Sequence, residues 1–152
     1  MALKIWELVS IILLTLVSGM YWGPWLALSR SLGTFEPKVF LPLVRRMSRN
    51  MGSLMTFLTP AALLSTVPVL WLSHGAQPET FALTLAALLL FALTLAVTML
   101  VEVPIVMQIA AWTESTLPDD WQRLRDRWGA FHYARIIPSL VGLVLLLAGA
   151  IF

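Results

Sequence analysis

Five residues in the last third of the chain combine indole, guanidinium and imidazole side chains at helical spacing. Trp121, Arg125, Trp128, His132 and Arg135 are separated by steps of four, three, four and three residues. Such steps place side chains on one face of an α-helix. Histidine is the most frequent general base, and arginine stabilises a developing anion. The spacing predicts one wall of a pocket, while the alternative is an interfacial belt of tryptophan and arginine at a membrane surface.

Glu102 interrupts a long apolar sequence and is a second candidate for chemistry. It follows the 22-residue stretch 80–101, which contains no Asp, Glu, Lys or Arg, and the apolar pattern continues beyond Pro104. A carboxylate within a membrane is costly and by default marks a functional site. We expect Glu102 near the membrane boundary, where it orients His132 or pairs with an arginine. The alternative is a solvated residue at a helix end.

Aromatic side chains also gather at the end of the first apolar stretch. The segment Gly19–Trp25 holds two glycines, one proline and three aromatic residues. Tyr21 and Trp25 are four residues apart and share a helical face, so they are placed to stack on a flat aromatic ligand. An aromatic belt at the membrane surface is again the alternative.

The overall composition restricts which elements can position these residues. Of the 152 residues, 59% are hydrophobic and 12% are charged, with a net charge of +2. Soluble domains carry about 25% charged residues. This difference excludes an ordinary soluble enzyme, a disordered segment and a nucleic-acid-binding module. Because the chain has no cysteine, disulfide and thiolate chemistry are excluded as well.

Four stretches without charged residues indicate membrane spans. A bilayer core about 30 Å thick requires about 20 residues of helix. We therefore predict an all-α integral membrane four-helix bundle that forms a single transmembrane domain over residues 1–152. An additional amphipathic helix is expected before the second and fourth spans, the latter opened by a capping box at Thr116–Asp119. The predicted spans cover about 8–29, 51–72, 80–102 and 135–152.

The basic residues predict how the bundle is oriented. Lys4 is the exception among ten Lys and Arg residues, because the other nine, Arg30 included, lie between spans one and two or between spans three and four. The positive-inside rule places those segments in the cytoplasm and both termini outside, in a bacterial cytoplasmic membrane. The expected partners are the lipid bilayer and a lipophilic small molecule, with no nucleic acid. Small residues serve the bundle or a homo-oligomer: Ala82, Ala86, Ala92, Ala96, Gly142 and Gly149.

The two histidines do not form a shared metal site in this arrangement. His74 precedes the third span and His132 precedes the fourth, so the bilayer places them about 30 Å apart. We therefore predict no metal site and no cofactor. A haem held by a single histidine is disfavoured, although it is not excluded.

The residues from Glu102 to Arg135 resemble the anthrone-oxygenase-like family of small four-helix membrane proteins, largely a domain of unknown function. The resemblance covers essentially the whole chain. It implies oxidation of anthrones to anthraquinones with no established need for a metal or flavin. One position departs from it, because Val106 stands where the family often has Asn. The residues that carry the resemblance are Glu102–Ile105, Trp112, Leu117–Trp121, Leu124–Trp128, His132 and Arg135.

Two functional hypotheses remain open at this point. The first is a membrane-embedded oxygenase that acts on a lipophilic anthrone- or quinol-like molecule without a cofactor. In it, His132 is the base, Arg135 or Arg125 stabilises the anion, and Glu102 orients the base. The second hypothesis is a non-enzymatic protein for small-molecule binding, transport or membrane assembly. The side chains expected to contact the substrate are Tyr21, Trp25, Trp121, Arg125 and Trp128.

Overall fold

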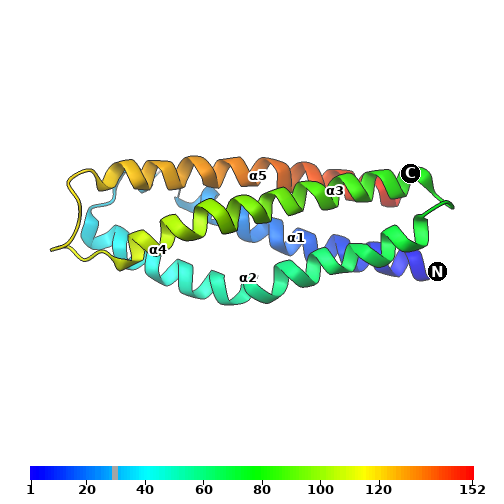
Figure 1. Cartoon of the computed structure of the whole chain (residues 1–152), viewed down its shortest axis with the longest axis horizontal. Helices are drawn as coiled ribbons and strands as arrows, with labels where there is room; N and C mark the ends of the chain where they lie inside the picture. The colour runs from blue at the N-terminus through cyan, green and yellow to red at the C-terminus, as the bar shows by residue number, and fades with distance from the viewer. Residues whose placement is uncertain (29–30) are drawn as a thin grey trace.

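The computed structural model describes residues 1–28 and 31–152, and all its regular elements are helical (Figure 1). Arg30 and the last residue of the first predicted span lie outside the described residues. The elements are α1 (Ala2–Leu28), η1 (Leu32–Thr34), α2 (Pro37–Ser73), α3 (Pro78–Val97), η2 (Thr98–Glu102), α4 (Val103–Ala111) and α5 (Trp121–Ile151).

Four helical segments of the described chain are long and apolar enough to cross a membrane. They are α1, α2, the continuous segment Pro78–Ala111 and α5. Large apolar side chains point outward from each of them, for example Leu16, Leu64, Leu89 and Val144, which are 53–67% exposed. The prediction of an all-α integral membrane four-helix bundle is confirmed, because these side chains need lipid around them.

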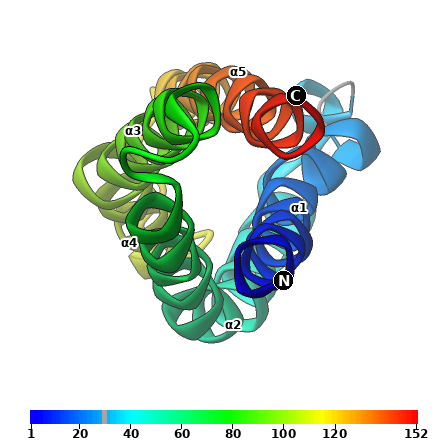
Figure 2. The ribbon, with the colours of Figure 1, turned by 90° about the vertical axis from the view of Figure 1, so that its right-hand side faces the viewer.

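The helices form an up-and-down ring in which chain neighbours are also neighbours in space (Figure 2). Helix α1 packs against α2 and α5, and α3 packs against the same two helices. Both termini and the turn at 74–77 lie at one end, here called the terminal end (Figure 1). The segments 31–36 and 112–120 lie at the opposite end, here called the basic end. Side chains far apart in sequence therefore meet at a common level.

Helices α2 and α5 each include the amphipathic segment that the sequence predicts before a span. The 37 residues of α2 extend about 55 Å, well beyond a hydrocarbon core of about 30 Å. The expected additional helices are thus the first turns of α2 and α5. The expected capping box is wrong, because α5 begins at Trp121 and Thr116 accepts a hydrogen bond from the Thr113 amide at 2.8 Å.

Two apolar clusters fill the bundle along its axis. One lies toward the terminal end and includes Leu14, Val17, Phe91 and Leu146. Within it, α3 and α5 approach closely at Gly142, where an added Cβ would lie 3.0 Å from the Phe91 ring. The second cluster lies at the basic end and consists of Phe40, Leu41, Val44, Ile105, Ile109, Trp121 and Trp128.

A π-helical turn, η2, separates α3 from α4. The Val103 amide donates to the Thr98 carbonyl, which is the wider spacing of a π turn. Pro104 explains this turn, because its ring would clash with the carbonyl of Leu100 in a regular α-helix. The additional residue lets Glu102 face the interior while Met99 and Leu100 face outward.

Candidate functional site

Glu102 is buried at the level where the two apolar clusters meet, with only 2% of its surface exposed. One of its oxygens, Oε2, accepts a hydrogen bond from the Trp128 indole at 3.0 Å and lies 3.3 Å from Arg135 Nη2. The other oxygen, Oε1, is buried without a hydrogen-bond partner. A buried carboxylate requires a partner of opposite charge, which Arg135 supplies from α5.

His132 connects this ion pair to the first helix. Its Nδ1 lies 2.6 Å from Arg135 Nη2 and its Nε2 lies 2.8 Å from the Tyr21 carbonyl. Because arginine has only donors, Nδ1 must accept, and the neutral imidazole then donates from Nε2 to the carbonyl. Nδ1 is also 3.8 Å from Glu102 Oε2. The imidazole is thus held in one orientation by two helices.

Arg135 is enclosed by groups from three helices. Its guanidinium lies 4.8 Å from the centre of the Tyr21 ring, within the range of a cation–π contact. Its Nη1 donates to the Thr98 hydroxyl at 3.4 Å, while Nε is buried without a partner. A cation with only 9% of its surface exposed retains donor capacity for an incoming anion.

A cavity of about 370 Å³ lies against these residues. Tyr21, Glu102, Trp128, His132 and Arg135 line it together. Most of its remaining wall is apolar, and its size falls in the range of pockets for drug-sized ligands. The structure therefore brings a buried acid, a buried cation and an imidazole to the wall of a lipophilic chamber.

Three predicted contact residues lie away from this cavity. Trp25 packs edge-on against Tyr133 at 5.0 Å between ring centres and lines a smaller cavity of about 70 Å³ on the other side of His132. Trp121 belongs to the apolar cluster at the basic end. Arg125 lies 5.2 Å from the Trp121 ring and pairs with Asp126 at 2.9 Å. Trp121 and Arg125 shape the basic end instead, whereas Trp25 packs against the first apolar cluster.

Thr98 and a group of methionines contribute to the site without having been singled out from the sequence. Thr98 precedes Glu102 by four residues, and Met47, Met51 and Met55 follow one another at intervals of four. Both are helical-face spacings that sequence inspection can detect. Val106, the position that departs from the family pattern, lies in the cavity wall.

The donor set does not resemble a metal centre. Across residues 1–28 and 31–152, no group of three or more His, Cys, Asp or Glu side chains is placed to hold a metal ion. His74 directly follows the last residue of α2 and lies beside Phe81, whereas His132 lies within α5. The site therefore consists of one histidine, one carboxylate and one arginine.

These features define a class: small four-helix membrane proteins with a buried acid–base cluster facing a lipophilic cavity. A comparison with known families matches residues 46–145 to the family described as Anthrone oxygenase. The chain belongs to the anthrone oxygenase family. The matched region includes Glu102, Trp128, His132 and Arg135, whereas α1 with Tyr21 lies outside it. Neither the curated proteins nor the solved structures gave a match.

Proposed function

We propose that this protein is an oxygenase for a flat, lipophilic aromatic ketone with an acidic methylene, an anthrone-like molecule. One observation supports the proposal above others: the Glu102, His132 and Arg135 cluster is buried and lines a largely apolar cavity. Membership of the anthrone oxygenase family supports the same reaction class. No cofactor is required in the reaction that we propose.

The proposed reaction balances with dioxygen as the oxidant. A base removes one proton from the methylene carbon, and the resulting carbanion gives one electron to dioxygen. The radical pair recombines to form a C–O bond, and the peroxide takes up the proton. Loss of the second methylene proton and cleavage of the O–O bond then release water and leave a ketone. One oxygen atom enters the product and the other leaves as water.

His132 is the proposed base. Its Nδ1 lone pair becomes available only when substrate binds. In the free protein its Nδ1 lone pair is occupied by Arg135 Nη2 at 2.6 Å. A substrate carbonyl that acquires negative charge competes for the same guanidinium, because arginine binds an oxyanion more strongly than a neutral nitrogen. Nδ1 then becomes free to accept the proton. Glu102 Oε2, 3.8 Å away, stabilises the imidazolium that forms.

Dioxygen uptake by the protein in lipid vesicles tests this function. Anthrone is the probe, and the formation of anthraquinone is measured in parallel. We expect His132→Asn to lower kcat/KM by about a hundredfold or more, the usual loss for a general base. His74→Asn is the matched control, because it changes the other histidine at the exposed terminal end, and it should retain full activity. An active His132→Asn variant would contradict the assignment.

The same assay separates oxidation from the non-enzymatic alternative. A binding or transport protein would bind or move the aromatic compound without consuming dioxygen. Proton-driven uptake into vesicles that is lost in Glu102→Gln would favour transport. The oxygenase proposal expects substrate-dependent dioxygen consumption without such a proton gradient.

We also propose that the basic end faces the cytoplasm of a bacterial cell. Lys38, Arg45, Arg46 and Arg49 in the first turns of α2 lie there, together with Arg123 and Arg127 of α5. The rule for basic loops supports this orientation. Because the chain has no cysteine, single cysteines at Ser115 and Ala76, both exposed, can be labelled from outside intact cells. Labelling at Ala76 alone is expected, and labelling at Ser115 alone would reverse the orientation.

A further inference from the structure

Six of the seven methionines in the chain line the 370 Å³ cavity. The seventh, Met1, is fully exposed at the terminal end. Such a concentration is unexpected if methionine serves only to fill irregular gaps in a core, because these residues surround an open space. The six are Met20, Met47, Met51, Met55, Met99 and Met107.

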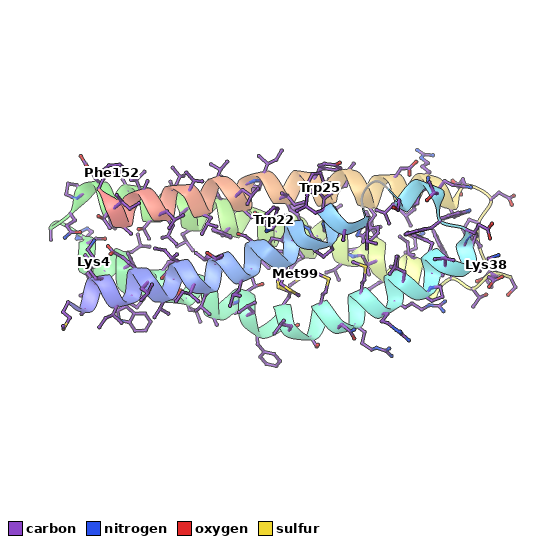
Figure 3. The ribbon with its side chains drawn as sticks, turned by 180° about the vertical axis from the view of Figure 1, so that it is seen from behind. Lys4, Trp22, Trp25, Lys38, Met99 and Phe152 are labelled. Carbon is purple, nitrogen blue, oxygen red and sulfur yellow. The ribbon has the colours of Figure 1, made fainter. Side chains whose placement is uncertain are left out.

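The methionines face each other across an opening at the side of the bundle. Met47, Met51 and Met55 follow one face of α2 and are half-buried. Met99 of η2 and Met107 of α4 stand opposite and are 55% and 67% exposed. Figure 3 shows Met99 and neighbouring sulfur atoms in the region where α2 curves away from the other helices.

The course of α2 explains why the cavity opens here. Helix α2 packs against α3 and against α4, but it makes hardly any close backbone approach to η2, which lies between them. It bows away from its neighbours along its middle (Figure 1). Ser48, Gly52 and Thr56 form the exposed rim on α2. The π turn and the bowed helix thus leave a lateral gap lined by thioethers.

The part of the opening nearest the terminal end, at Met55 and Met99, lies at the level of the membrane boundary. Met55 is 18 residues from the end of α2 at Ser73, which corresponds to about 27 Å of helix. Met99 is 21 residues from the start of α3 at Pro78, or about 32 Å. A hydrocarbon core of about 30 Å that begins at the terminal end therefore ends at this level. An amphiphilic aromatic ketone dissolved in the bilayer collects in such a boundary region.

We propose that the six methionines form a lateral gate and recognition surface for flat polycyclic aromatic molecules that enter from the bilayer. Thioether sulfur makes favourable contacts with aromatic rings, and the unbranched side chain adapts to ligands of different outline. The gate leads directly to Glu102, His132 and Arg135. The identity of the bound molecule as a substrate rests on the proposed function, whereas its binding at the methionines does not.

Photolabelling in phosphatidylcholine vesicles tests the gate without requiring catalysis. Benzophenone is the probe, because it is an apolar diaryl ketone whose excited state attacks methionine side chains. We expect labelling of Met51, Met55 and Met99 that excess anthraquinone suppresses. Labelling of Met1 is the internal control and should not change with anthraquinone. Equal, non-competed labelling of Met1 and the cavity methionines would overturn the proposal.

A plug at the rim provides an independent kinetic test. An added Cβ at Gly52 meets no atom within 4 Å, so a Gly52→Trp side chain can grow into the opening. Gly23→Trp is the matched control, because Gly23 also has open space but does not line the cavity. We expect Gly52→Trp to raise the KM for anthrone about tenfold or more, with kcat little changed. An unchanged KM would contradict lateral access.

The two tests separate this proposal from the proposed function. Competed labelling of the methionines in a protein that consumes no dioxygen supports the gate and refutes the oxygenase. Dioxygen consumption that depends on His132, combined with non-competed labelling and an unchanged KM in Gly52→Trp, supports the oxygenase and refutes the gate.

Discussion

The bundle buries two carboxylates, Glu102 and Glu7, with nearly equal exposure of 2% and 3%. They differ in their partners. Glu102 contacts Arg135, which is itself buried, and accepts a hydrogen bond from Trp128. Glu7 lies 3.1 Å from the ammonium of Lys4, whose side chain is 64% exposed and donates to the Ala150 carbonyl. Neither oxygen of Glu7 has a hydrogen-bond partner.

The difference shows that burial alone does not identify a chemical site in a membrane protein. The cavity beside Glu102 gives a ligand access to the carboxylate and its cation. Neither the 370 Å³ cavity nor the smaller cavity beside His132 includes Glu7. Lys4 reaches Glu7 from the membrane surface along its flexible stem, as basic side chains near helix ends commonly do. The pair at the terminal end therefore resembles a structural ion pair, and the pair at the cavity resembles a ligand-binding site.

The largest effect on stability is expected when the pair of Glu102 and Arg135 at the cavity loses its cation. Arg135→Leu leaves Glu102 buried and uncompensated, which costs about 3–5 kcal/mol in the free energy of unfolding. Titration with a denaturing detergent in mixed micelles measures this change. The double variant Arg135→Leu with Glu102→Leu should recover most of the loss, because no unpaired charge remains. Equal instability in Lys4→Leu would remove the distinction between the two pairs.

An intermediate effect is expected when Glu102 loses its indole donor. Trp128→Phe retains the aromatic packing against Phe40 but removes the hydrogen bond to a charged acceptor. Such bonds contribute about 1.5–3 kcal/mol. We expect this loss in the detergent titration, together with weaker oxidation of anthrone. Trp22→Phe, at a partly exposed position on α1, is the control and should leave both measurements unchanged.

The smallest effect is expected at the terminal end. Glu7→Gln removes one charge of an ion pair whose cation, Lys4, is largely exposed to solvent, so the free energy of unfolding should change by about 1 kcal/mol or less. The kcat and KM for anthrone should equal those of the unaltered protein. A large loss of activity in Glu7→Gln, with stability retained, would show that the terminal-end carboxylate takes part in function.

The sequence predicted the spans and the shared face of α5 because both depend on local patterns. Apolar runs determine which segments need lipid, and the steps of three and four place Trp128, His132 and Arg135 together on any regular helix. Glu102 was expected to orient the histidine or to pair with an arginine, and the structure places it beside both. These inferences required no knowledge of the distances between helices.

Features that depend on distances between helices were not predicted. From Trp121 to Arg135 the helix rises about 21 Å. Residues that share this face therefore lie at different levels, and Trp121 and Arg125 do not reach the cavity. The methionines were overlooked because methionine is an ordinary core residue. Their common role depends on the gap between α2 and η2. The sequence also gave no signal that Pro104 would be accommodated by a π turn within a continuous helix.

The π turn at η2 makes this chain sensitive to the deletion of a single residue. It acts as a single extra residue in the helical phase, and each residue corresponds to about 100° of rotation. Loss of one residue between Thr98 and Glu102 would restore a regular phase and turn all of α4 about its axis. Val106 and Ile109 would then exchange places with outward-facing neighbours such as Met107. Deletion of one codon would thereby turn the interior wall outward without any amino acid being substituted.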